Sequence, residues 1–164
     1  MIGPPDLHHI RHLARHEDAG GALQRICTYL RDQVEHYDWV GFYLADPVDR
    51  LLLLGPFAGA PTEHLKIPYG RGICGQAAES SDAFVVPDVT AETNYLSCSI
   101  QTRAEIVLPV WHEGEFVGEL DIDSHTVNPF TAEDDDLLAA VVRLCAPLVA
   151  SIFPRPGARP VSSP

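Results

Sequence analysis

The chain has 164 residues, of which 46% are hydrophobic and 8% aromatic, a composition typical of one globular domain with a sizeable core. Its 23 acidic and 11 basic side chains give a formal net charge of −12, which repels phosphate backbones and anionic lipid surfaces. The charge therefore argues against nucleic-acid binding and membrane docking, and it is compatible with small ligands that carry a positive charge.

The sequence shows neither a membrane span nor a secretory signal. No apolar run approaches the ~20 residues of a transmembrane helix, and the N-terminal stretch MIGPPDLHHIRHLARHED has no apolar core. None of the four cysteines forms a CxxC pair. We expect a cytoplasmic protein whose thiols stay reduced unless they serve catalysis or sensing.

An N-terminal helix is predicted over residues 6–16, because Leu7, Ile10 and Leu13 recur at helical spacing. The opposite face carries three histidines at i, i+4 and i+8, namely His8, His12 and His16. Such a ladder can bind a divalent metal, and the alternative is a plain polar surface. We assign residues 1–18 to a helical extension that precedes the main domain.

A second helix is predicted over residues 21–37, after a break at Gly20 and Gly21. Its apolar stripe consists of Leu23, Ile26, Leu30 and Val34. Cys27 lies on the same stripe, so we interpret it as a small buried core residue.

A first hairpin is predicted to join residues 39–44 to residues 50–54, because turn-forming residues occupy 46–49. The following segment, 55–75, is dense in glycine and proline and is predicted to be an irregular loop. A short helix is expected over residues 74–80.

A strand over residues 83–87 and a second hairpin within residues 104–124, turning at Glu113–Gly114, complete the predicted sheet. Two hairpins between terminal helices indicate an α+β domain, with an antiparallel sheet and helices packed on one face.

A C-terminal helix is predicted over residues 131–152, with Thr131 as N-cap and Asp134 completing a capping box. Its buried stripe is expected to contain Leu137, Val141, Leu144, Cys145 and Leu148. We assign residues 19–153 to the main domain and 154–164 to a disordered proline-rich tail.

The segment GELDIDS concentrates acidic side chains. If it is a strand, Glu119, Asp121 and Asp123 share one face, with neighbouring carboxylates ~6.6–7 Å apart. Glu105 begins the paired strand and could add a fourth. This face is either solvated or lines a pocket for an ammonium group, in which at least one carboxylate has a raised pKa.

Two cysteines stand outside the predicted cores. Cys74 lies in the glycine-rich stretch GRGICGQA, where the backbone can approach a ligand closely. Cys98 lies between two serines in a polar loop. Either could be inert, but thiols beside acidic groups that donate protons are suited to sulfoxide, peroxide or acyl chemistry.

Six segments in order, WVGFYL, LLGPFAG, IPYGRGICG, NYLSCS, AEIVLPV and GELDIDS, resemble the free methionine-(R)-sulfoxide reductase family, which is built on a GAF domain. The resemblance covers about residues 21–150. It implies a GAF-like α+β fold with N- and C-terminal helices on one face of a central antiparallel sheet. It also implies the reduction of free L-methionine-(R)-sulfoxide to methionine.

The resemblance implies a role for each matching position. Cys98 matches the catalytic cysteine, and Cys74 matches a cysteine that can resolve its oxidised form. The residues that hold the substrate are Glu105, Asp121, Asp123, Trp39 and Tyr43, the last two as aromatic walls or as plain core.

The implied mechanism needs no metal and no organic cofactor. Glu105 or Asp123 activates the S=O group, Asp121 and its neighbours bind the ammonium group, and the Cys98 thiolate attacks sulfur. The resulting sulfenic acid condenses with Cys74, and thioredoxin or a similar dithiol restores both thiols. The terminal helices are pairing surfaces in this family, which implies a homodimer.

One departure from the family pattern leaves alternatives open. Many members carry a third cysteine ten residues before the GICG cysteine, where this chain has His64. The chain could therefore be a weaker enzyme, or a non-catalytic GAF module that binds a small ligand such as an amino acid. A further alternative is a metal site formed by Cys74, Cys98 and a histidine such as His64 or His125.

Overall fold

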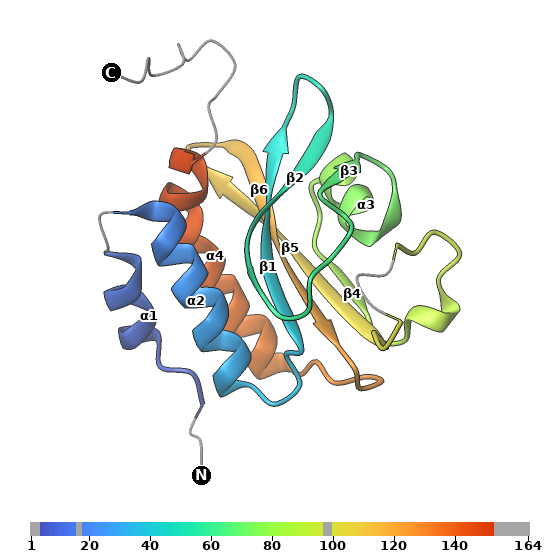
Figure 1. Ribbon diagram of the computed structural model, residues 1–164, viewed down its shortest axis with the longest axis horizontal. Helices are drawn as coiled ribbons and strands as arrows, with labels where there is room; N and C mark the ends of the chain where they lie inside the picture. The colour runs from blue at the N-terminus through green and yellow to red at the C-terminus, as the bar shows by residue number, and fades with distance from the viewer. Residues whose placement is uncertain (1–3, 16–17, 97–99, 153–164) are drawn as a thin grey trace.

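The computed structural model describes residues 4–15, 18–96 and 100–152 (Figure 1). Its centre is a six-stranded sheet in the order β3-β2-β1-β6-β5-β4, in which every pairing is antiparallel. The strands are β1 (Trp39–Asp46), β2 (Leu51–Ala58), β3 (Lys66–Pro68), β4 (Phe84–Val86), β5 (Ala104–His112) and β6 (Glu115–Ser124). Both predicted hairpins are confirmed, as β1–β2 and β5–β6.

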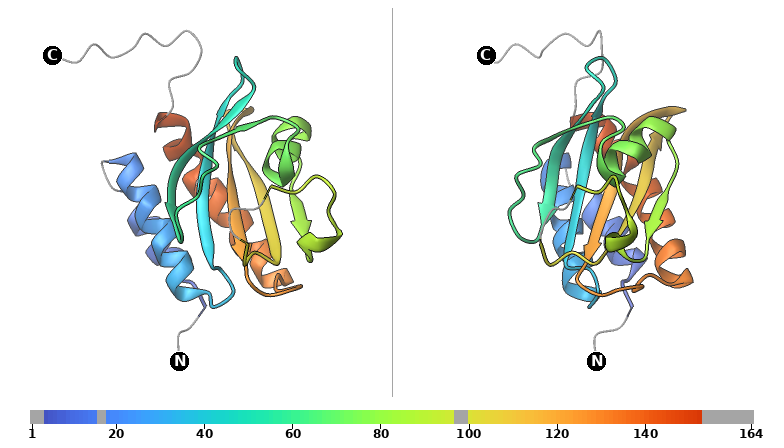
Figure 2. Two further views of the ribbon diagram at one scale, coloured as in Figure 1. Left: turned by 45° about the vertical axis from the view of Figure 1, so that its right-hand side comes forward. Right: turned by 90° about the vertical axis from the view of Figure 1, so that its right-hand side faces the viewer.

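The helices lie on both sides of this sheet. The N- and C-terminal helices cover one face, as predicted: α1 (Leu7–Ala14), α2 (Ala19–Gln33) and α4 (Ala132–Ile152). The short helix α3 (Gly72–Ser80) packs on the opposite face against β5 and β6, and a 3-10 turn, η1 (Val89–Ala91), follows β4 (Figures 1 and 2). The α+β fold class is therefore confirmed.

Alternation along the strands divides the interior into two cores. On β1, Val40, Phe42 and Leu44 face the terminal helices, whereas Trp39 and Tyr43 face α3. The predicted N-terminal helix joins the first core, because Ile10 is fully buried there. Among the described residues, no helix combines the length and the apolar character that a membrane span requires.

Several predicted boundaries are wrong. The second helix ends at Gln33 rather than at residue 37, and β3 lies inside the segment predicted to be an irregular loop. Gly20 and Gly21 lie inside the first turn of α2, since a glycine costs only about 1 kcal/mol in a helix and the buried stripe that follows outweighs it. β2 continues through Gly55 and Pro56 into the predicted loop. Proline is tolerated there because β3 pairs only with residues 51–53 of β2. Pro56 has no N–H, and it lies beyond the part of β2 that hydrogen-bonds to β3, so no hydrogen bond to β3 is lost.

The capping box of α4 is confirmed, but the buried face of the helix is rotated about the helix axis relative to the predicted one. The Thr131 N–H donates to Asp134 Oδ2 at 2.7 Å, and the Asp134 N–H donates to Thr131 Oγ1 at 3.4 Å. The fully buried positions include Leu138 and Val149, whereas the predicted Leu137, Leu144 and Leu148 are partly exposed. The rotation arises because α4 packs against the sheet and against α1 and α2 at once.

Candidate active site

The acidic residues of β6 form one row on the face of the sheet that α3 covers. Asp123 lies opposite Trp39 on β1 and Glu105 on β5, while Asp121 lies opposite Gly41 and Val107. The predicted alternation of this strand is confirmed, since Leu120 and Ile122 enter the core under the terminal helices.

These carboxyl groups are buried. The exposed fractions are 3% for Glu105, 0% for Glu119 and Asp121, and 2% for Asp123. The interpretation of this face as a solvated surface is therefore wrong. Buried carboxyl groups need a proton, a hydrogen bond or a cation, and among the described residues no lysine or arginine forms an ion pair with Glu105, Glu119 or Asp121.

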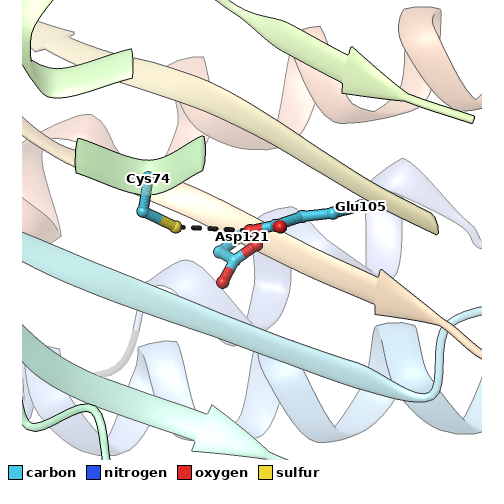
Figure 3. A group of neighbouring side chains, drawn as sticks. All are labelled: Cys74, Glu105 and Asp121. Atoms are coloured by element: carbon cyan, nitrogen blue, oxygen red, sulfur yellow. Dashed lines mark hydrogen bonds between the residues drawn. The ribbon is translucent and has the colours of Figure 1, made fainter. Parts of the chain in front are cut away.

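Cys74 faces the acidic row from the first turn of α3. Its Sγ donates to Glu105 Oε1 at 3.5 Å, and Asp121 lies beside this pair (Figure 3). The turn before it is tight: Gly72 has φ +67°, and a Cβ at this position would stand 2.7 Å from the Leu96 side chain. Glycine therefore lets Leu96 approach the start of α3 closely.

Burial sets the protonation of the cluster. It raises the pKa of Glu105 well above its ordinary value, and the neighbouring charges of Asp121 and Asp123 raise it further. It raises the pKa of Glu119 in the same way; the Cys74 thiol opposes this shift but is not placed for a regular hydrogen bond. The pKa of Asp121 rises to about 6 by burial, with Glu105, Cys74 and the charge of His64 opposing the shift. Burial therefore favours the protonated forms of Glu105 and Glu119, while Asp121 has a pKa of about 6.

Two aromatic side chains flank the acidic row. The Trp39 ring lies over Gly41, where a Cβ would stand 2.3 Å from the indole, and it stacks on Phe57 with a centroid separation of 5.4 Å. Tyr43 is fully buried, and its hydroxyl donates to the His64 carbonyl at 3.2 Å. The residue at the position of the absent third cysteine therefore belongs to the surroundings of the site.

A cavity of about 130 Å³ lies beside Asp123. Its lining is Arg31, Asp38, Trp39, Ala60, Gln101, Thr102, Asp123 and His125. Two predicted site residues, Trp39 and Asp123, thus border one cavity. Its volume suits a small molecule rather than a macromolecule.

The remaining cysteines divide clearly. Cys27 and Cys145 are fully buried in the core under the terminal helices, as predicted, and burial raises the pKa of Cys145 to about 12. Neither is suited to redox chemistry, because the thiolate is the reactive form. Cys98, the predicted nucleophile, lies outside the described residues, which reach Leu96 on one side and Ile100 on the other.

Metal binding has one geometric candidate in the described part of the chain. Cys74, Glu105 and Asp121 can each offer a ligand atom, and these atoms lie within 4.8 Å of one another. A thiolate with two carboxylates could hold a divalent ion. The predicted histidine ladder is less suited: His8 and His12 are exposed on α1, and His16 lies outside the described residues.

Two side chains beside the candidate site were not assigned a role in advance, although Glu119 was predicted to share the acidic face. Glu119 is buried two positions from Asp121 on the same face, and strand alternation was the signal for it. Arg31 borders the cavity from the last turn of α2, and no local pattern in the sequence marks it.

Comparison with known proteins gives concordant matches. The family model described as GAF domain matches residues 18–148. The free methionine-R-sulfoxide reductase of Escherichia coli is 35% identical over 120 residues, 73% of this chain and 71% of that protein. The structure of type II free methionine-R-sulfoxide reductase from Thermoplasma acidophilum is 38% identical with a TM-score of 0.77, covering 88% of this chain and 97% of that one. That of the Neisseria meningitidis enzyme in complex with its substrate is 30% identical with a TM-score of 0.82, covering 92% and 95%.

Proposed function

The chain belongs to the GAF domain family, in the group that contains the free methionine-R-sulfoxide reductases, and we propose that it reduces free L-methionine-(R)-sulfoxide to methionine. The observation that carries this proposal is the buried contact of Cys74 with Glu105 beside Asp121. A thiol, a protonated carboxyl and an ionised carboxylate then border one substrate site.

Glu105 is the proposed acid. A sulfoxide becomes electrophilic at sulfur when its oxygen accepts a proton or a strong hydrogen bond. Burial and the neighbouring carboxylates raise the pKa of Glu105 and so favour its protonated form, which can donate a proton toward the sulfoxide oxygen. The sequence left Glu105 and Asp123 as alternatives, and the position of Glu105 on the Cys74 thiol favours Glu105.

Asp121 and Asp123 are the proposed site for the substrate ammonium group. Asp121, with a pKa of about 6, carries a negative charge at neutral pH, and Asp123 borders the cavity. A peptide-bound methionine lacks this positive charge on its nitrogen and would leave a buried carboxylate without a counter-ion.

Cys98 is the proposed nucleophile, on the grounds of the family resemblance. Its thiolate attacks the substrate sulfur and forms an S–S bond, and the protonated oxygen leaves that sulfur as water. Water then attacks Cys98 Sγ, the S–S bond breaks, and methionine leaves Cys98 as a sulfenic acid. Leu96, two residues earlier, contacts Gly72 at the start of the helix that bears Cys74.

Cys74 is the proposed resolving residue. Its thiol attacks the sulfenic sulfur, a disulfide forms, and the hydroxyl group leaves as water. Thioredoxin or a similar dithiol then reduces the disulfide. The Glu105 carboxyl, 3.5 Å from Sγ, can accept or return the proton of Cys74 during this exchange.

The test is oxidation of NADPH coupled through thioredoxin reductase and thioredoxin, with free L-methionine-(R)-sulfoxide as substrate. Wild-type protein should turn over, and Cys98→Ser should be inactive. Glu115→Gln, an exposed change on β6, is the matched control for Glu105→Gln. Absence of turnover by protein with intact thiols would refute the proposal, and methionine binding without turnover would favour the alternative of a ligand-binding GAF module.

Cytoplasmic location and a homodimer stay predictions. α1 packs against both α2 and α4, so it covers part of the surface through which the terminal helices would pair. Light scattering on eluted peaks of full-length protein and of a variant lacking residues 1–15 measures whether pairing occurs and whether α1 contributes.

A further inference from the structure

The cavity beside Asp123 contains a positive side chain as well as a negative one. Arg31 reaches it from the last turn of α2, and among the described residues of the lining it is the one lysine or arginine. A cavity of about 130 Å³ therefore brings a guanidinium and a carboxylate to the same small space. This charge pattern is complementary to a zwitterion, which carries an anion and a cation on one carbon atom.

The guanidinium of Arg31 is held in place without being neutralised. Its Nε donates to the main-chain carbonyl of Asp38 at 3.2 Å. Within the described part of the chain Arg31 forms no ion pair. The Nη groups therefore remain as charged donors, in the planar arrangement that matches a carboxylate.

Asp38 contacts two residues of the cavity lining, one through its main chain and one through its side chain. Its carbonyl accepts from Arg31, while its carboxylate accepts from the His125 N–H at 2.7 Å and lies 3.3 Å from His125 Nδ1. The negative charge of Asp38 is thus directed to His125 rather than to the guanidinium. In a chain with a net charge of −12, this arrangement preserves one local positive charge for a ligand.

We propose that Arg31 binds the α-carboxylate of the substrate while Asp123 binds its ammonium group. This inference rests on the proposed function and adds a specificity residue to it. The side chain of the amino acid then extends past Trp39 toward Glu105 and Cys74, so the sulfoxide meets the acid only when both charges at Cα are engaged. Esters, amides and residues within a peptide lack the carboxylate that Arg31 recognises.

The competing explanation is structural. Arg31 lies in the last turn of α2, where any cation interacts favourably with the helix dipole. A residue that only stabilises the helix would change stability and leave the choice between substrates unaltered. The two roles therefore differ in a measurable way.

The experiment compares the free acid with its methyl ester, methionine-(R)-sulfoxide methyl ester, in wild type, Arg31→Gln, Arg31→Lys and the control Arg25→Gln. Arg25 lies on the same helix but outside the cavity lining. Loss of a charge-assisted hydrogen bond should raise KM for the free acid about tenfold in Arg31→Gln, with kcat and the KM for the ester little changed. Arg31→Lys should be intermediate and Arg25→Gln should match wild type.

Binding of methionine itself, measured by titration calorimetry, gives a readout that does not need turnover. We expect Arg31→Gln to bind methionine about tenfold more weakly and methionine methyl ester as wild type does. Equal losses for acid and ester, or no loss for either, would overturn the role of Arg31 while wild-type binding upholds the proposed function. If wild-type protein binds neither methionine nor its sulfoxide, both the inference and the proposed function fail.

Discussion

Asp121 gives the sharpest test of the buried acidic row, because its burial and its function have opposite consequences for a single substitution. The residue is fully buried, and its pKa rises from 3.8 to about 6. Since the folded form binds the proton more tightly than the unfolded chain does, folding stability falls as pH rises through this interval. Above pH 6 the full cost of burying the charge applies.

The size of this cost follows from the shift. At 1.36 kcal/mol per pKa unit, the change from 3.8 to about 6 corresponds to about 3 kcal/mol. Asp121→Asn has nearly the same shape and cannot ionise, so at pH 8 it should be more stable than wild type by up to about 3 kcal/mol. In a domain of this size that is a rise in Tm of about 6–12 °C.

The assay is urea unfolding of ligand-free protein at several pH values between 3.5 and 8. The advantage of Asp121→Asn should be near zero at pH 3.5, grow between pH 4 and 6, and then level off. The same variant should bind methionine at least tenfold more weakly at pH 8. Asp82→Asn, an exposed change in the turn after α3, should alter neither quantity.

Two outcomes would refute this reasoning. If Asp121→Asn were less stable than wild type at pH 8, the carboxylate would already be stabilised in the folded protein by an interaction that the described residues do not provide. If its advantage did not change with pH, the ionisation of Asp121 would not be the origin of the effect.

Three further predictions concern other positions. Glu105→Gln should lower kcat about 10²–10³-fold in the coupled assay while thermal unfolding at pH 7 shows unchanged or increased stability, and a kcat near wild type would contradict its role as acid. Cys74→Ser should release one equivalent of methionine in single-turnover experiments and then stop, and mass mapping of oxidised wild type should find a bridge between Cys74 and Cys98; another bridge would reassign the resolving thiol. Asp134→Asn weakens the 2.6 Å hydrogen bond from Tyr37 and the cap of α4. Unfolding in urea should therefore show a free energy of unfolding lower by about 1–3 kcal/mol. An unchanged free energy of unfolding would show that the cap is dispensable.

Much of the local structure could be predicted because it depends on neighbouring residues. The alternation in GELDIDS places its carboxyl groups on one face whatever lies above them, and the turns at 46–49 and Glu113–Gly114 set the two hairpins. The errors occurred where a distant partner decides the outcome. β2 passes through Pro56 because that part of the strand lacks a second neighbour, and α4 turns its stripe to meet α1, α2 and the sheet.

The family resemblance added the identity of the candidate site residues, which periodicity could not supply. The segments that carry it are spread over most of the chain, and the match to the GAF domain family confirms it. The proposed contribution of Arg31 was not predictable, since it depends on a cavity lined by residues of α2, β1 and β6 and by Gln101 and Thr102.

The sequence by itself determined which side chains share a face and which segments pair, because pleat and turn chemistry act over a few residues. Only the tertiary structure decided that the acidic face is closed off from water, since this requires α3 to fold over β5 and β6. That closure favours the protonated form of Glu105, because a carboxyl group cut off from water and surrounded by like charges has a raised pKa.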